Sequence, residues 1–157
     1  MFSGMSPASC ACLIGQYRGS ASCPELVGYE VHVPGDKVGV DSRLVAWQIG
    51  ELENSCRDAC TAFEVQRAQV AGDKAAELLL FVKVLCDALE RFFWIHPYAN
   101  GNGHSGRLLV STLLARHGFP ALKWHIDQKV PYDDALKAYR NNNKKPLIRF
   151  ILQSIRP

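Results

Sequence analysis

The sequence predicts a mainly α-helical protein with one small β-hairpin near its N-terminus. Two observations lead to this prediction: long stretches in which apolar residues recur every three or four positions, and a Pro-Gly-Asp turn between two short β-favouring pieces. The chain has 157 residues, 48% of them hydrophobic and 21% charged, so it can bury a core of its own. We expect a single domain over residues 1–157, with an N-terminal segment and hairpin in 1–40 and a helical core in 41–157.

The first forty residues are rich in Gly, Ser and Pro and contain the predicted hairpin. The segment LVGYEVHV (26–33) favours an extended conformation, PGD (34–36) is a turn signal, and KVGV (37–40) can return as the second strand. One hairpin alone is marginally stable in water, so we expect it to lie against the helices.

Two long helices are predicted next. Asp41 or Ser42 is a good N-cap for the first helix, and Asp73 can cap the second. The second helix, over residues 74–95, is apolar on nearly all sides, which is typical of a central helix. The predicted inward face of the first helix consists of Val45, Ile49, Leu52, Cys56, Cys60 and Phe63.

Three further helices complete the predicted core. Residues 108–116 have helical periodicity, and Gly118 followed by Pro120 is a helix-stop signal. Asp133 can cap a short helix that ends at Tyr139, and Pro146 suits the first turn of a last helix. The inward residues of that last helix are predicted to be Leu147, Ile148, Ile151, Leu152 and Ile155.

Composition argues against a membrane span and against nucleic-acid binding. The longest apolar run, about residues 78–82, is too short to cross a bilayer, and the N-terminus lacks the regions of a secretory signal. We therefore expect a cytoplasmic protein, unless a dedicated secretion system exports it. The net charge of +3 is concentrated near the C-terminus, which we interpret as a solvated basic face, and no basic stripe is interleaved with aromatic residues.

Six cysteines are compatible with disulfides, but the chain length and the missing export signal argue against them. Cys56 and Cys60 lie four residues apart in a helical pattern, so we interpret them as small core residues on one face. Because no Cys or His pair stands at zinc-finger spacing, we expect no metal–thiolate site.

The stretch IHPYANGNGHSGR (95–107) lies between two apolar helical runs and combines several groups with chemical potential. Its glycines let the backbone turn sharply, and they precede a helix, whose N-terminal N–H groups attract anions. Arg107 adds a guanidinium suited to phosphate oxygens, and a histidine such as His96 is the usual general base. An ordinary helix–loop–helix corner would also use Gly and Asn, but the coincidence of these groups within one short segment favours an active site.

The segment HPYANGNGHSGR (96–107) resembles the signature of the Fic (filamentation induced by cAMP) family. The matching positions are His96, Pro97, an aromatic at Tyr98, Gly101, Asn102, Gly103 and Arg107. GQYR (15–18) is similar to the start of the family's domain, the hairpin to its target-positioning flap, and KKPLIRFI (144–151) to its closing helix. The resemblance covers most of the chain and implies a Fic-like helical bundle with a flap.

The resemblance also implies an activity. It indicates a protein adenylyltransferase, a nucleotidyltransferase that moves AMP from ATP to a Ser, Thr or Tyr hydroxyl of a target protein, with Mg²⁺ or Mn²⁺ bridging phosphates. His96 is then the general base. The expected nucleotide- and phosphate-binding residues are Gly101, Asn102, Gly103, His104, Gly106 and Arg107. Tyr29, Val31, His32 and Val33 of the flap are expected to hold the target segment as an added strand.

Two positions depart from the family signature. Its acid, which helps to bind Mg²⁺, is Asn100 here, and a neutral carbonyl is a weaker magnesium ligand; its first arginine is His104. Two alternatives therefore stay open: a Fic-type transferase with another donor (UMP, phosphocholine or phosphate), and a nucleotide- or partner-binding module without turnover. The family's inhibitory motif is absent from the sequence, so the chain is unrestrained, held by a separate antitoxin-like inhibitor, or part of a longer protein.

Overall fold

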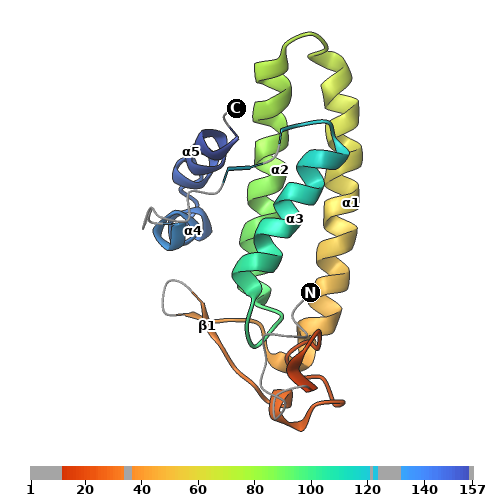
Figure 1. Ribbon diagram of the computed structural model, residues 1–157. Coiled ribbons are helices and arrows are strands. Elements are labelled where there is room, and N and C mark those ends of the chain that lie inside the picture. The colour runs from red at the N-terminus through yellow and green to blue at the C-terminus, as the bar shows by residue number, and fades with distance from the viewer. Residues whose placement is uncertain (1–11, 34–36, 121, 124–131, 156–157) are drawn as a thin grey trace.

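The computed structural model describes residues 12–33, 37–120, 122–123 and 132–155. Five α-helices and one two-stranded hairpin form in this part of the chain, so the predicted mainly α fold is confirmed. The helices are α1 (Val45–Gln69), α2 (Lys74–Ile95), α3 (Asn102–Arg116), α4 (Tyr132–Arg140) and α5 (Lys145–Ser154). Figure 1 shows α1, α2 and α3 running side by side, α4 and α5 on one flank, and the hairpin near the end where α2 leads into α3.

Helix α2 is the centre of the fold, as its apolar pattern predicts. It packs against α1 on one side, α3 on another and α5 on a third. The Asp73 carboxylate accepts hydrogen bonds from the N–H groups of Ala75 and Ala76, which confirms the predicted cap. The apolar residues that α2 buries are Phe81, Val82, Leu85, Cys86, Ala88, Leu89, Phe92, Phe93 and Ile95.

Helix α1 follows a single 3-10 turn, η3 (Ser42–Leu44), rather than starting at the predicted cap. The Asp41 side chain caps this turn by accepting the N–H of Arg43 at 2.9 Å. Of the predicted inward face, Val45, Leu52 and Phe63 are buried. Ile49, Cys56 and Cys60 are half-buried against the core because they line an open groove between α1 and α3.

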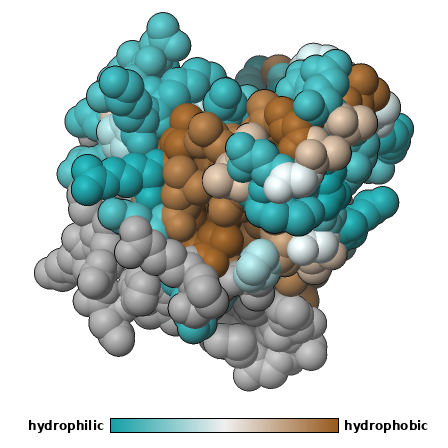
Figure 2. Space-filling model, turned by 90° about the horizontal axis from the view of Figure 1, so that it is seen from above, coloured by the Kyte–Doolittle hydropathy of each residue, from teal (hydrophilic) through white to brown (hydrophobic). Residues whose placement is uncertain are grey.

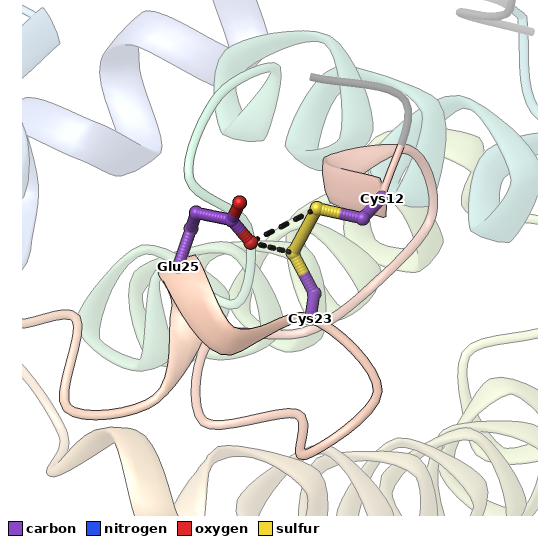
Figure 3. Close-up of side chains that lie close together, drawn as sticks. All are labelled: Cys12, Cys23 and Glu25. Atoms are coloured by element: carbon purple, nitrogen blue, oxygen red, sulfur yellow. Dashed lines mark hydrogen bonds between the residues drawn. A yellow bond between two sulfur atoms is a disulfide. The ribbon is translucent and has the colours of Figure 1, made fainter. Parts of the chain in front are cut away.

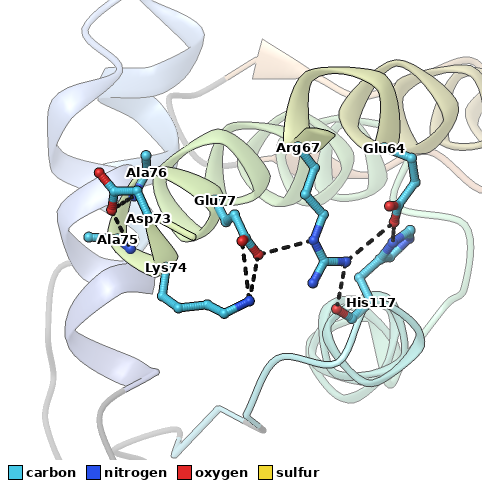
Figure 4. Close-up of polar contacts among 8 residues, drawn as sticks. All are labelled: Glu64, Arg67, Asp73, Lys74, Ala75, Ala76, Glu77 and His117. Atoms are coloured by element: carbon cyan, nitrogen blue, oxygen red, sulfur yellow. Dashed lines mark hydrogen bonds and ion pairs between the residues drawn. The ribbon is translucent and has the colours of Figure 1, made fainter. Parts of the chain in front are cut away.

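A chain of charged groups closes the bundle at the end far from the hairpin (Figure 4). Arg67 of α1 donates to Glu77 of α2 at 3.0 Å, and Lys74 contacts the same carboxylate at 3.2 Å. His117, just after α3, lies 2.6 Å from Glu64 of α1. The Glu77 side chain is only 4% exposed, and the Lys74 hydrogen bonds, followed by Arg67, lower its pKa. Three helices are thereby held together at this end.

Helices α4 and α5 pack on the flank of α2. The Tyr139 hydroxyl donates to Asp87 at 2.5 Å, and Arg140 donates to Glu90 at 2.6 Å, so α4 is bound to α2 through polar pairs. In α5 the predicted inward residues Leu147, Ile151 and Ile155 are buried, while Ile148 and Leu152 are partly buried.

The hairpin pairs β1 (His32–Val33) with β2 (Lys37–Val38) in antiparallel register, His32 opposite Val38. The predicted turn over 34–36 lies outside the described residues. The prediction of one extended strand over 26–33 is wrong, because Pro24–Leu26 forms the 3-10 turn η2 and Gly28 adopts a left-handed φ of 72°. Proline favours the first position of such a turn, so the extended stretch starts later in the chain than predicted.

The structure also contains a disulfide that the sequence argued against. Cys12 and Cys23 are bonded, with Cα atoms 5.5 Å apart. The sequence argument concerned the cellular compartment, whereas this pairing follows from how the loop between the two residues folds back on itself. One carboxylate oxygen of Glu25 lies 3.2 Å from each sulfur (Figure 3). These three side chains are the one group of potential metal ligands among the described residues, but bonded sulfurs offer no thiolates.

The surface is mixed in polarity. Seen from above the bundle, apolar side chains form a band flanked by hydrophilic ones (Figure 2). None of the helices in the described part of the chain combines the length and the apolarity that a bilayer span requires.

Candidate active site

His96 lies at the end of α2, in the junction that leads to α3. Its N–H still donates to the Phe92 carbonyl at 2.9 Å, but its backbone is left-handed, with φ 47° and ψ 62°. Few non-glycine residues adopt this conformation, and it costs backbone energy. It turns the chain out of the helix directly into Pro97 and places the imidazole at the helix end.

The His96 ring is set up to stay neutral. Burial, followed by the charge of Arg18, lowers its pKa, and a smaller effect of the Phe93 backbone opposes this. Its Nδ1 atom is buried and has no hydrogen-bond partner among the described residues. A neutral imidazole can accept a proton at neutral pH. Since Nδ1 is closed off from solvent, Nε2 is the nitrogen that a substrate could reach.

Arg18 is a residue of this site that the sequence analysis did not single out. Its side chain is 1% exposed and makes four hydrogen bonds, all to backbone carbonyls. Nε donates to His96 O at 2.7 Å, and Nη2 to Ile95 O at 2.8 Å. Nη1 donates to Tyr29 O at 2.7 Å, and Nη2 also to Val40 O at 2.9 Å. Burial lowers the pKa of Arg18.

Asn102 closes the loop between the two helices. Its side-chain oxygen accepts the Tyr98 N–H at 3.0 Å, and its amide nitrogen donates to the Tyr98 carbonyl at 2.7 Å. The residue is 4% exposed. The structure therefore gives the Asn102 amide a role in holding the loop, and its expected phosphate contact stays a prediction.

Asn100 and Gly101 form the tightest part of the loop. The Gly101 N–H donates to the Asn100 side-chain oxygen at 2.7 Å, and Gly101 has a left-handed φ of 84° just before α3. The oxygen expected to hold a metal therefore already accepts one hydrogen bond, and a neutral carbonyl is a weak magnesium ligand. No group of three potential ligands gathers around Asn100 in the part of the chain that the structure describes. The donor set does not fit a protein-held Mg²⁺.

The first two turns of α3 carry the basic groups His104 and Arg107. Gly103 has space above it, because an added Cβ would meet only the Arg107 guanidinium, at 3.6 Å. An Arg107 nitrogen lies 3.1 Å from Nδ1 of His104, so both side chains are on one side of the helix start. The N–H groups at the start of a helix have no intrahelical acceptors. A helix N-terminus beside a guanidinium is favourable for an anion.

Gly106 has a packing role. It is buried, and an added Cβ would lie 2.8 Å from Phe93 Cζ and 3.3 Å from Leu89. The missing side chain lets α3 pack closely on α2. The expected phosphate contact of Gly106 stays a prediction.

The expected flap residues do not all face the same way. The Val33 side chain is only 3% exposed, so it packs inward and cannot offer side-chain contacts to a target. The reason is strand alternation, which turns His32 outward and Val33 inward, and the expected pairing of this segment with a target stays a prediction. Tyr29 is 41% exposed, and the Val31 carbonyl accepts the Gly39 N–H at 3.0 Å.

A groove of about 730 Å³ runs along the bundle between α1 and α3. Tyr17 and Tyr98, whose rings are 5.4 Å apart, belong to its lining at the His96 end. Arg116 and His117 line it where α3 ends. No pattern in the sequence indicated this groove, because it depends on how three distant segments pack.

Partial similarity to known proteins bears on this site. Over 78 residues, 50% of the chain, it is 36% identical to protein adenylyltransferase Fic of Aedes aegypti. Over 57 residues, 36% of the chain, it is 39% and 40% identical to proteins of the same name from Culex quinquefasciatus and Drosophila melanogaster. The matched part spans only 16%, 11% and 12% of those proteins' own lengths. No protein-family model matches the chain. The similarities support the resemblance to the Fic family.

Proposed function

We propose that this chain is a Fic-type protein adenylyltransferase that moves AMP from ATP to a Ser, Thr or Tyr hydroxyl of a target protein. The observation that carries the proposal is the position of His96, a histidine of lowered pKa at the end of α2. A short loop joins it to the N-terminus of α3, whose second turn carries Arg107. The name of the partial relatives, protein adenylyltransferase, agrees with this arrangement.

The reaction requires one proton transfer and one displacement at phosphorus. His96 accepts the proton of the target hydroxyl, whose oxygen forms a bond to the α-phosphorus of ATP. The bond from that phosphorus to the bridging oxygen breaks, and pyrophosphate leaves. Because the Gly101 N–H donates to the Asn100 side chain, the N–H groups of Asn102 and Gly103 stabilise the charge that develops on the α-phosphate, and Arg107 binds the departing phosphates.

The chain contributes little to metal binding in this proposal. Divalent ions supply charge neutralisation in phosphoryl chemistry when they are bound to nucleotide phosphates. Because Asn100 offers one neutral oxygen, which already accepts a hydrogen bond from the Gly101 N–H, we assign no step to a protein-held metal. His104 lies beside Arg107, at the position of the first arginine in the family signature. It therefore shares in phosphate binding as a hydrogen-bonding group.

The target segment is held along the hairpin. In the described part of the chain the sheet has only the two strands β1 and β2, so strand edges remain for an added segment. His32 and Val38 face outward opposite each other, and Val38 is 55% exposed. Backbone pairing gives affinity with little side-chain selectivity, and the outward side chains add the selectivity.

The test is intact-mass spectrometry of the protein and of lysate proteins after incubation with ATP and Mg²⁺ or Mn²⁺. We expect a mass increase of one AMP with the wild type and none with His96→Ala. The matched control is His117→Asn, another half-buried histidine, at the far end of α3. This variant should retain the transfer even if it is less stable.

Two results would replace the proposal. An adduct of UMP, phosphocholine or phosphate from another donor, but none of AMP from ATP, would keep the His96 mechanism and change the donor. Binding of ATP without any covalent product from any donor would indicate a nucleotide-binding module without turnover.

A further inference from the structure

The burial of the Arg18 guanidinium is an unusual feature of this fold. Charged side chains are rarely fully buried, because removing a charge from water is costly unless every donor is paired. All four side-chain hydrogen bonds of Arg18 go to carbonyl oxygens rather than to a carboxylate. Two of these oxygens belong to Ile95 and His96, at the C-terminal end of α2, where the helix dipole favours a cation.

The other two bonds reach the hairpin. Tyr29 lies shortly before β1, and Val40 shortly after β2, so the guanidinium contacts both arms at their base. The Val40 N–H also donates to Trp94 O at 3.4 Å, next to the residues that Arg18 contacts in α2. One planar group therefore joins the histidine to the segment on which a target would lie.

From these contacts we infer that Arg18 is a positioning residue, which fixes the backbone of His96 and holds the hairpin in register with it. The inference rests on the proposed function insofar as His96 is the base. Arginine suits this role because its donors diverge in one rigid plane, and lysine offers a single flexible nitrogen.

The loop that carries Arg18 is itself tightly held. The Cys12–Cys23 disulfide closes it, and the Gly19 N–H donates to Leu26 O at 2.7 Å. Gly19 has a left-handed φ of 79°, and an added Cβ would lie 2.1 Å from Ser42 O. The Arg18 backbone N–H donates to Pro97 O at 2.8 Å, just after His96. Arg18 is thus held through its backbone N–H as well as through its guanidinium.

The charge of Arg18 provides a readout that is independent of activity. It lowers the pKa of His96, second only to burial. Among the charged groups in the described part of the chain, Arg18 is the one that shifts this pKa. Replacing Arg18 by an uncharged residue should therefore raise the His96 pKa. Replacing it by lysine, which keeps the charge but not the planar set of donors, should not.

The test compares Arg18→Lys and Arg18→Gln with wild type. The control is Arg67→Lys, because Arg67 is a partly buried arginine that donates to a carboxylate and to a backbone carbonyl, but at the far end of the bundle. The His96 ring is titrated by NMR of labelled histidine, with His96→Ala used for assignment. We expect a raised His96 pKa in Arg18→Gln, and no change in Arg67→Lys.

The kinetic arm measures AMP transfer. We expect Arg18→Lys to reduce kcat by roughly 100-fold with little change in the KM for ATP, since small misplacement of a catalytic group has this effect. Arg67→Lys should leave kcat within about twofold. A folded Arg18→Gln with unchanged His96 pKa, or an Arg18→Lys no slower than Arg67→Lys, would overturn the inference. Failure of transfer in wild type removes the proposed function but leaves the NMR arm decisive for the link from Arg18 to His96.

Discussion

The side-chain amide of Asn102 and the backbone of Tyr98 are joined by two hydrogen bonds, 3.0 Å and 2.7 Å long, which close the loop in front of α3. Because the two bonds use the oxygen and the nitrogen of one amide, no isosteric replacement preserves both. The pair fixes the distance between the end of α2 and the start of α3, and therefore the distance from His96 to the first turn of α3.

Replacing Asn102 by Asp tests this pair. The new carboxylate cannot donate to the Tyr98 carbonyl, and two oxygens would face each other in a buried place. We expect a loss of about 1–3 kcal/mol in the free energy of unfolding. Urea denaturation measures the change, and Asn54→Asp on the exposed face of α1 is the control. Equal stability of the two variants would contradict the loop-holding role.

Gly106→Ala tests the close approach of α3 to α2. The added methyl would lie 2.8 Å from Phe93, so overpacking should cost about 1–3 kcal/mol. Thermal unfolding should show a lower Tm, by about 2–4 °C for each kcal/mol. Gly103→Ala is the matched control, because its methyl has room and alanine is the better helix former, so stability should be equal or higher. A neutral Gly106→Ala would show that the two helices can separate freely.

The pH dependence of transfer tests the state of His96. Its pKa is lowered by burial and by Arg18, so the ring is neutral at pH 7 and, under the proposed function, ready to accept a proton. Activity should remain full down to the ordinary histidine value of about 6.5 and fall only below it, as the ring gains a proton. The profile of kcat/KM for the free enzyme reports this pKa. An acid limb centred above pH 7 would conflict with a depressed value.

Acid stability tests the charged network at the far end. The pKa of Glu77 is lowered by Lys74 and Arg67, so the folded state holds the charged carboxylate more firmly than the unfolded chain does. Its stabilising contribution is complete above the unfolded value of about 4.3 and disappears as the pH falls through the lower folded pKa.

Wild type should therefore exceed Glu77→Gln in stability at pH 7, and the gap should close near pH 3. Glu53→Gln serves as the control, because Glu53 is 73% exposed in its pair with Arg57 and should matter little at either pH. A gap that is the same at pH 7 and pH 3 counts against a role for the Glu77 charge. Urea unfolding at the two pH values gives the comparison.

Local sequence patterns predicted the features that depend on neighbouring residues, such as helix periodicity and caps. The nearly continuous apolar surface of α2 and its Asp73 cap follow from composition and spacing, and both are present. The hairpin was also expected, but its first strand is shorter, because the turn that starts at Pro24 includes Leu26 and Gly28 is left-handed.

The remaining features depend on contacts between distant residues. Nothing near Arg18 in sequence indicates that its partners lie 77 and 78 residues further along the chain. The sequence does not distinguish Gly103 from Gly106. Only the structure shows that Phe93 packs where a Gly106 side chain would lie, while the space next to Gly103 is open. The Cys12–Cys23 bond is likewise decided by loop geometry.

The left-handed backbone of His96 has a consequence for selection experiments. A non-glycine residue in this conformation costs roughly 1–2 kcal/mol, and glycine avoids the cost. A library randomised at this position and screened only for thermal survival should therefore enrich glycine, then asparagine, and discard histidine. The same library screened for transfer should keep histidine alone. The difference in free energy of unfolding between the glycine variant and the wild type would measure how much stability the protein gives up to keep an imidazole at the end of α2.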